Sequence, residues 1–314
     1  GQPLRSTRWC GCRKLRRADV GAPAAAPVIR VPASSAHLGA GFDVFGMALS
    51  MYGDVGAGDP PDGGRALDEH HPATIAFARL GGAGPIWMRS SIPMGRGLGF
   101  SGVARVGGAA LASVLGADDP RDALAARRDD VWEVAADLEG HADNVAASLY
   151  GGIVASVGGP TDGRSGHENG RILRLRVGAT LVAAVVVLWI PSATTSTDRS
   201  RAGLGEQVPR PDAVYNLGRA VQFALAVERD DPALLPGSTD DRLHQPARLA
   251  SVPDAADALD AGTAAGAWCG WLSGSGPTVA LLCDAAVADT VEAALPATGH
   301  RRQVRIDTTG AHPL

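Results

Sequence analysis

Hydrophobic residues from position 27 onward recur with two spacings, and short segments rich in Gly, Pro and polar residues separate the two kinds of run. Continuous or alternating apolar runs, which are typical of β-strands, lie at 27–32, 85–91, 151–157, 171–177, 181–190, 278–284 and 302–307. Patterns typical of helices cover about 101–116, 120–138, 212–229, 232–243, 253–265 and 285–295. Together they predict an α/β or α+β fold in which helices cover sheets.

The polar, glycine-rich stretch GGPTDGRSGHENGR, at 158–171, is the best candidate for a boundary between two domains. We therefore expect one domain at 28–160 and a second at 161–314. Residues 1–27 mix Arg with Gly, Ala and Pro, and we expect them to form a disordered extension outside the fold. An organelle transit peptide or a nucleic-acid-binding arm is the alternative for this segment.

Composition points to a globular protein that binds small molecules. Of its 314 residues, 45% are hydrophobic and 20% are charged, and a net charge of -4 gives no reason to expect nucleic acid or an acidic membrane as a partner. The longest apolar run, at 181–190, is about half the length of a membrane-spanning helix and ends at Pro191. We expect a cytoplasmic protein.

The stretch SIPMGRGLGFSGVARVGG, at 91–108, predicts a site for an anion. Gly95, Gly97 and Gly99 permit positive φ angles and close approach of the backbone, and a helix of small side chains follows them. A helix that begins after such a loop points free N–H groups and the positive end of its dipole at a bound anion. A glycine loop alone is weak evidence, because a tight turn before a closely packed helix needs the same residues.

Lysine content limits how a nucleotide could be held. Lys14 is the only lysine of the chain and lies in the expected extension, so neither a Walker A lysine nor a protein-kinase lysine is present in the fold. The glycine loop also lacks the Walker A spacing and does not open the first strand–helix unit of the chain, as a Rossmann loop would. A nucleotide bound here would depend on backbone amides, a metal ion and arginines.

Several other polar stretches are candidates for the same site. Those at 31–49 and 271–284 are small-residue loops beside strand-like runs, although SGSGPT at 273–278, taken alone, is more typical of a surface turn. The stretch DLEGHADNVAASLY, at 137–150, brings together an acid, a histidine, an aspartate and an asparagine, which suit a metal ion or a hydroxyl substrate, or else cap a helix through Asp143 or Asn144. For DEHH, at 68–71, a helix N-terminus is favoured over a metal site.

Four ordered motifs resemble those of the GHMP small-molecule kinases: PASSAHLGAGFD, P-x-x-x-G-L-G, EGHADN and LSGSGPT. Within that family the chain is most similar to the homoserine kinases, because PASSA-x-LG-x-GFD, EGH-x-DN, TSTDRSR and RLHQPAR are typical of them. The resemblance runs from about residue 28 to the C-terminus. It implies an α+β protein with an N-terminal β/α domain of the ribosomal-protein-S5 type that binds ATP and a C-terminal ferredoxin-like domain.

The activity that the resemblance implies is transfer of the ATP γ-phosphoryl group to the side-chain hydroxyl of L-homoserine, which gives O-phospho-L-homoserine on the route to threonine. It also implies Mg²⁺ as a cofactor and a homodimer as the assembly. Two alternatives stay open. The chain could phosphorylate another small alcohol, such as a mevalonate-like or sugar-like compound, or it could be an inactive member that binds ligands without turnover.

By the same resemblance, the ATP phosphates would contact Pro93, Gly95, Arg96, Gly97, Leu98, Gly99 and Ser101. Glu139 and Ser101 would hold Mg²⁺, which prefers carboxylate and phosphate oxygens, and Asp137 is an alternative ligand. The family has Ser where this chain has Phe100, which removes one hydroxyl from the expected metal site.

For the substrate, the resemblance assigns Asp43 to the ammonium group and Arg201 and Arg248 to the carboxylate. The rest of the substrate pocket would comprise His37, where the family has Asn, together with Asn144, Thr197, Gly274 and Gly276. Asn144 and His141 are the expected catalytic residues. Because Asn cannot accept a proton, catalysis would depend on alignment and on charge stabilisation, which a loose phosphoryl-transfer transition state permits.

Overall fold

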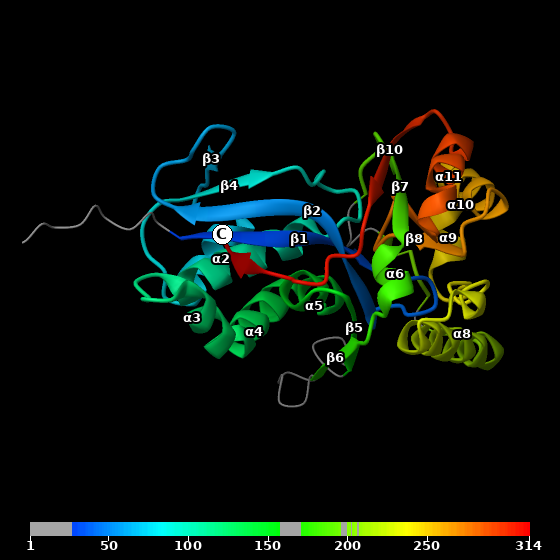
Figure 1. The fold of residues 1–314 in the computed structure, drawn as a ribbon, viewed down its shortest axis with the longest axis horizontal. Helices are drawn as coiled ribbons and strands as arrows, with labels where there is room; N and C mark the ends of the chain where they lie inside the picture. Colours follow the sequence, from blue (N-terminus) through cyan, green and yellow to red (C-terminus); the bar gives the residue numbers. More distant parts are fainter. Residues whose placement is uncertain (1–26, 158–170, 196–199, 202, 206) are drawn as a thin grey trace, which may run out of the picture.

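The computed structural model describes residues 27–157, 171–195, 200–201, 203–205 and 207–314, which form two antiparallel sheets with helices packed against them (Figure 1). The first sheet contains β1 (Val28–Ala36), β2 (Phe45–Ala57), β3 (Arg65–Ala66), β4 (Ile86–Ser90), β5 (Ile153–Val157), β6 (Arg171–Leu175) and β11 (His312–Pro313). The second has the order β10 (Gly299–Val304), β7 (Val185–Pro191), β9 (Val279–Cys283), β8 (Cys269–Leu272).

Helices pack against both sheets (Figure 1). The first group contains α1 (Pro72–Arg79), α2 (Phe100–Val114), α3 (Pro120–Ala126), α4 (Arg128–Glu139) and α5 (Asp143–Tyr150). The second group contains α6 (Ala179–Ala183), α8 (Arg210–Arg229), α9 (Gln245–Leu249), α10 (Pro253–Ala264) and α11 (Ala288–Ala294). Among the described residues, no helix is both long and apolar enough to cross a membrane.

The two sheets do not divide the chain at one point. β6 pairs with β5, and β11 pairs with β1, so the first sheet includes segments from both sides of the boundary expected near residue 160. Most of the stretch expected to form that boundary, 158–170, lies outside the described residues, as do residues 1–26. The C-terminal segment therefore returns to the first sheet and ties the two halves together.

Helix α2 can lie close to the first sheet because its buried face consists of small residues. A Cβ atom at Gly107 would overlap Val55 of β2, and one at Gly108 would overlap the backbone of Ala73 in α1. This close packing explains why the sequence after the glycine loop has few large side chains. It also fixes the N-terminus of α2 against the end of β1.

Four expected elements differ from the structure. The stretch 31–49 was expected to be a loop, but β1 continues through the buried small residues at 33–36 and β2 begins at Phe45. The expected helix at 120–138 is two helices, because Arg127 leaves helical geometry at φ -111 and ψ 17. The expected helix at 232–243 is a single turn, since Gly237 with φ 71 prevents its continuation. The expected strand at 181–190 begins as α6.

Candidate active site

The glycine loop has the geometry that its sequence predicts. Gly95, Gly97 and Gly99 all have left-handed backbones, with φ of 66°, 71° and 69°. A Cβ atom at Gly97 would overlap the carbonyl oxygen of Ser273, and one at Gly99 would overlap the hydroxyl of Ser34. Helix α2 starts at the next residue without a side-chain cap, so its first N–H groups stay available to an anion.

A cavity of about 230 Å³ opens beside this loop, at the seam between the two sheets. Of the residues expected at the site, its lining includes His37, Pro93, Gly95, Arg96, Gly97, Leu98, Gly99, Ser101, Glu139, His141, Asn144, Arg201, Arg248 and Gly274. Asp43 and Gly276 lie outside the lining, and Thr197 is outside the described residues. The fold thus brings most of the expected residues, from six separate segments, to one place.

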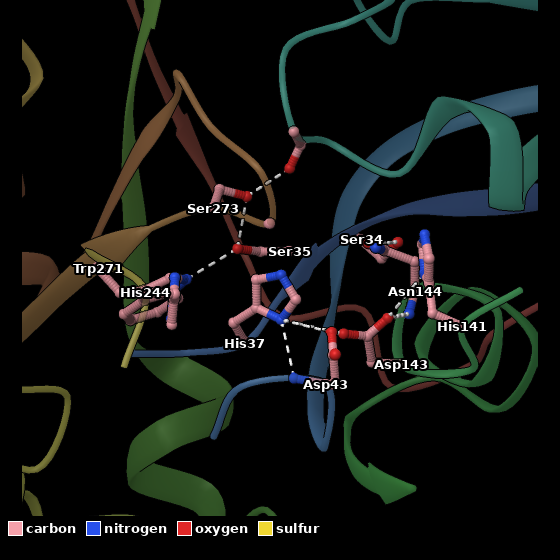
Figure 2. A network of polar contacts seen from close by, with 12 residues as sticks. Ser34, Ser35, His37, Asp43, His141, Asp143, Asn144, His244, Trp271 and Ser273 are labelled. Atoms are coloured by element: carbon pink, nitrogen blue, oxygen red, sulfur yellow. Dashed lines mark hydrogen bonds and ion pairs between the residues drawn. The ribbon is translucent and has the colours of Figure 1, made fainter. Parts of the chain in front are cut away.

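A chain of hydrogen bonds joins the second sheet to the glycine loop (Figure 2). The indole N–H of Trp271 donates to Ser35 Oγ at 2.8 Å, and Ser273 Oγ lies 2.7 Å from Ser35 Oγ. Ser273 Oγ in turn donates to the carbonyl oxygen of Gly97 at 2.6 Å. Because the proton of Ser273 is used on Gly97, the hydroxyl of Ser35 must donate to Ser273. The stretches 31–49 and 271–284 were expected at the site, but no individual role was predicted for Ser35, Trp271 or Ser273.

Glu139 stands at the end of α4 and accepts from two residues of α2. Ser101 Oγ donates to Glu139 Oε1 at 2.5 Å, and Arg105 forms an ion pair with the other carboxylate oxygen. Ser101 and Arg105 are four positions apart and so lie on one face of the helix. No role was predicted for Arg105 from the sequence. The carboxylate and hydroxyl beside a phosphate-binding helix terminus fit the oxygen ligands that Mg²⁺ prefers.

Asp143 organises the turn between α4 and α5. Its side chain is fully buried, and its Oδ1 accepts from the backbone N–H of Asn144 at 2.8 Å and lies 3.3 Å from Nδ1 of His141. Burial alone would raise the pKa of Asp143, but its contacts with His141 and His37 lower the pKa below the ordinary range and keep the carboxylate charged. Helix α5 takes Ala142 as N-cap, without a side-chain cap, so the capping alternative for Asp143 and Asn144 is wrong.

Asn144 faces the end of β1 and the glycine loop. Its Oδ1 accepts from Ser34 Oγ at 2.9 Å (Figure 2). A Cβ atom at Gly99 would overlap Ser34 Oγ and lie 3.1 Å from Asn144 Oδ1. An amide group that receives a hydrogen bond on oxygen keeps its two N–H donors for other partners. Asn144 can therefore orient a ligand oxygen at this point, but it cannot act as a base.

At the other side of the cavity, Arg201 meets Asp43. The two Nη atoms of Arg201 lie 2.9 and 2.5 Å from the two carboxylate oxygens of Asp43, which is the parallel arrangement that a guanidinium favours. Asp43 and His37, both in the loop after β1, have positive φ angles of 57° and 72°. Such strain in residues other than Gly is maintained only where the surrounding contacts enforce it.

His244 fixes the second arginine of the cavity, Arg248. Nη1 of Arg248 lies 3.1 Å from His244 Nδ1 and donates to the carbonyl oxygen of Gly274 at 3.1 Å, while His244 Nε2 lies 3.0 Å from the carbonyl oxygen of Gly39. Burial lowers the pKa of His244 to about 3, so its ring is neutral and Nδ1 can accept from the arginine. The motif RLHQPAR contains both residues, but no role for His244 was predicted from it.

Arg96, expected among the phosphate contacts, has its guanidinium engaged by the backbone. It donates to the carbonyl oxygens of Pro191 and Ser192, both at 2.8 Å, and to that of Met94 at 3.2 Å. These contacts fasten the glycine loop to the end of β7. A phosphate contact of Arg96 stays a prediction.

Comparison with known proteins agrees with this arrangement. The GHMP kinases N terminal domain matches residues 66–152, and the GHMP kinases C terminal domain matches residues 223–301. The homoserine kinase of Streptomyces coelicolor is 36% identical over 318 residues, which cover 93% of this chain and 95% of that protein. The chain belongs to the GHMP kinase family. It is thus an enzyme of an ATP-using phosphotransferase family, as the four ordered motifs predicted.

Other relatives of this GHMP kinase are also named homoserine kinase. The homoserine kinase of Moorella thermoacetica is 36% identical over 82% of this chain and 87% of its own length. A solved structure described as a putative homoserine kinase from Listeria monocytogenes has 27% identity, a TM-score of 0.72, and coverage of 92% and 99% of the two chains. The homoserine kinase structure from Cytophaga hutchinsonii, at 24% identity, has a TM-score of 0.75 over 92% of this chain and 97% of that one. The expected two-part GHMP architecture of the α+β class is confirmed.

Proposed function

We propose that this GHMP kinase transfers the γ-phosphoryl group of ATP to the side-chain hydroxyl of L-homoserine. One observation carries the proposal: a single cavity contains the glycine loop at one side and two arginines, Arg201 and Arg248, at the other. The loop suits a chain of phosphates, and a pair of arginines with a neighbouring aspartate suits the carboxylate and ammonium groups of an amino acid. Several relatives at about this degree of similarity are named homoserine kinase.

In this proposal, catalysis depends mainly on alignment. The bond between the γ-phosphorus and its bridging oxygen breaks as the substrate hydroxyl oxygen bonds to the phosphorus, and the hydroxyl proton passes to an oxygen of the transferred phosphoryl group. The N-terminus of α2 stabilises negative charge on the phosphate oxygens, and Asn144 directs the hydroxyl. Fixing two reactants in line contributes roughly 7–11 kcal/mol, whereas a general base contributes a factor of about 10² to 10⁴ in rate. The absence of a basic group at Asn144 is therefore compatible with activity.

Glu139 and Ser101 are the residues that we propose to hold Mg²⁺, with Asp137 as the alternative ligand. When bound, Mg²⁺ would neutralise charge on the transferring phosphoryl group. Arg105 lies on the same helix as Ser101 and forms an ion pair with the second carboxylate oxygen of Glu139. This ion pair orients the Glu139 carboxylate in the proposed metal site. His141 stays a candidate for contact with the hydroxyl, because it lines the cavity while its Nδ1 is held near Asp143.

An ADP-release assay on the full chain tests the proposed activity. L-homoserine, L-serine, mevalonate and a panel of sugars are compared as acceptors, with and without Mg²⁺. We expect turnover that needs both L-homoserine and Mg²⁺. Faster turnover of mevalonate or of a sugar would support the other kinase activity, and binding of homoserine without ADP release would support an inactive ligand-binding protein.

We also propose that the chain forms a homodimer through α8. Val214, Leu217, Val221 and Leu225 follow one stripe of this helix and are between 41% and 67% exposed. Gly218 lies in the middle of the stripe, and a Cβ atom there would contact nothing. An exposed glycine makes a helix about 1 kcal/mol less stable than an alanine would, and within the described part of the chain no packing contact requires a glycine here. A glycine does, however, allow another helix to approach closely. Two antiparallel copies of α8 would bring their Gly218 residues together near the centre of the contact.

A further inference from the structure

A second cavity adjoins the glycine loop and has a volume of about 740 Å³, compared with about 230 Å³ for the active-site cavity. It lies where the end of β4 and the residues that follow it approach the end of β7 and the start of β10 (Figure 1). Pro93 and Arg96 line both cavities, whereas Gly97, Glu139 and Asn144 line only the smaller one. This β10 cavity, as we call it, is therefore separate from the site proposed for catalysis.

The ionisable side chains that line the β10 cavity are all basic. Arg96, His300, Arg301 and Arg302 belong to its lining, and no Asp or Glu of the described residues does. In that part of the chain, none of the three arginines forms an ion pair with a carboxylate. The whole chain has a net charge of -4, so a general excess of basic residues does not account for this cluster. A hollow with uncompensated positive charge on its walls attracts anions.

Two of these arginines keep N–H donors for a ligand. Arg96 uses three of its five N–H groups on backbone carbonyl oxygens, which hold the guanidinium in place without neutralising its charge. Arg302 is exposed and makes no hydrogen bond with the described residues. Arg301, by contrast, donates to the carbonyl oxygen of Leu295 and lies on the opposite face of β10, because side chains alternate along a strand. The charge offered to a ligand therefore comes from Arg96 and Arg302.

The remaining walls of the β10 cavity are largely apolar. Met51, Ile92 and Ile190 line it and are themselves between 1% and 7% exposed, which makes them fixed parts of the core. An inorganic anion would use the arginines and leave this apolar surface in contact with water. An organic anion would use both, and the volume is within the range of pockets that bind small molecules.

We propose that the β10 cavity binds a small organic anion, whose carboxylate or phosphate contacts Arg302 in the field of Arg96 and whose apolar body covers Met51, Ile92 and Ile190. The inference does not depend on the proposed function. Arg96 also fastens the glycine loop to the end of β7 through the carbonyl oxygens of Pro191 and Ser192. A ligand in this cavity would thus lie against the arginine that holds the nucleotide loop.

The test compares two compounds of the same shape that differ in charge, 4-(trifluoromethyl)benzoate and 4-(trifluoromethyl)benzamide. Fluorine NMR titrations with the full chain give their dissociation constants. We expect about 1 mM or tighter for the benzoate, and binding of the amide that is at least about fivefold weaker. Equal binding of both compounds, or no binding of the benzoate, would overturn the proposal.

Arg302→Gln tests which residue recognises the charge. Because Arg302 is exposed, the substitution leaves the core intact. We expect the variant to bind the benzoate as weakly as the amide, whereas Arg65→Gln, which changes an exposed strand arginine outside the cavity, should keep the difference. An unchanged preference for the benzoate in Arg302→Gln would contradict the assignment.

A final comparison locates the bound compound, because the arginines of the active-site cavity could also attract a carboxylate. Thr298→Trp places a large side chain on the exposed rim of the β10 cavity and should weaken binding of the benzoate. Saturating ADP or L-homoserine should leave benzoate binding to the wild type unchanged. Displacement by ADP would assign the β10 cavity to the nucleotide, and displacement by L-homoserine would place the benzoate in the active-site cavity; either result would overturn the proposal.

Discussion

Arg201 and Asp43 form a bidentate ion pair although 158 positions separate them in the sequence. From the family resemblance, the two residues were expected to bind opposite ends of one amino acid. The two side chains neutralise each other, which keeps both charges compensated at a partly buried place. Under the proposed function, a bound amino acid would exchange this contact for two charge-assisted contacts of its own. The ion pair would then link binding at the carboxylate to binding at the ammonium group.

Replacing Arg201 by Gln tests this link. The variant loses a carboxylate partner for the substrate and leaves Asp43 without its counter-ion, and losing one member of a buried charge pair costs about 2–5 kcal/mol. We expect KM for L-homoserine to rise at least tenfold and KM for ATP to change less than twofold. Steady-state kinetics in each substrate measures both values. The control is Arg242→Gln, which removes an arginine from an exposed ion pair with Asp212, and equal increases in both KM values would contradict the assignment.

Glu139→Gln tests the proposed metal site. The change keeps the size of the side chain but removes the charge that pairs with Arg105 and that Mg²⁺ would need. We expect at least a hundredfold loss of kcat/KM and a loss of Mg²⁺-dependent tightening of ATP-analogue binding, measured by calorimetry with and without Mg²⁺. Asp137→Asn, two positions earlier on α4, serves as the matched control. If that variant loses the Mg²⁺ effect and Glu139→Gln keeps it, Asp137 is the ligand.

How far the sequence predicts the site depends on whether a contact is local. The glycine loop and the turn around Asp143 each lie within a few residues, so their chemistry is visible in the motifs. Arg105 was missed because its partner, Glu139, is 34 positions away. His244 was missed although Arg248 lies only four positions on, because its burial and its contact with Gly39 depend on a distant segment. No short-range pattern marks Arg105, apart from its spacing of four positions from Ser101.

The fold could be predicted to a similar extent. Long runs with one clear period gave strands and helices in the right places, such as β9 and α8. The end of β1 and the start of β2, within 31–49, were read as a loop because their small and polar residues are typical of turns. These residues are small because α2, α5 and the second sheet pack closely on them, as the overlap of a Cβ at Gly46 with the backbone of Asp143 indicates. Tertiary packing of this kind leaves no periodic signal in the sequence.

Gly97→Ala tests the contact between the glycine loop and the second sheet. An alanine there adds left-handed strain of about 1–2 kcal/mol and also overlaps the carbonyl of Ser273. Gly116→Ala is the matched control, because Gly116 has φ 75° but open space around its Cβ position. We expect Gly97→Ala to lose ATP-analogue binding and to be less stable in urea unfolding than Gly116→Ala. Equal stability and retained binding would mean that the loop can move away from Ser273 without consequence.

His244 should make stability fall as the solution becomes acidic. Burial depresses its pKa from 6.5 to about 3, so between these values the unfolded chain binds a proton that the folded protein excludes. The free energy of unfolding is therefore unaffected by this group above pH 6.5. Below pH 6.5 it falls by about 1.4 kcal/mol per pH unit because of His244. Urea unfolding at pH 7.5, 6 and 5 should therefore show a shallower pH dependence for His244→Asn. The control is His300→Asn, which changes an exposed strand residue and should leave the slope unchanged. Burial also lowers the pKa of His71, so His71 adds to the pH dependence of the wild type and of both variants alike.

The stripe on α8 leads to a prediction about assembly. Leu217→Asp would place a charge in the centre of the proposed contact between two copies, where it would have to lose its water without gaining a partner. We expect the wild type to sediment as a dimer at micromolar concentration and the variant as a monomer with an unchanged melting temperature. Ile75→Asp on α1, which is 42% exposed, controls for the loss of an exposed apolar side chain away from α8 and should stay dimeric. A monomeric wild type, or a dimeric Leu217→Asp variant, would mean that the stripe has another partner or none.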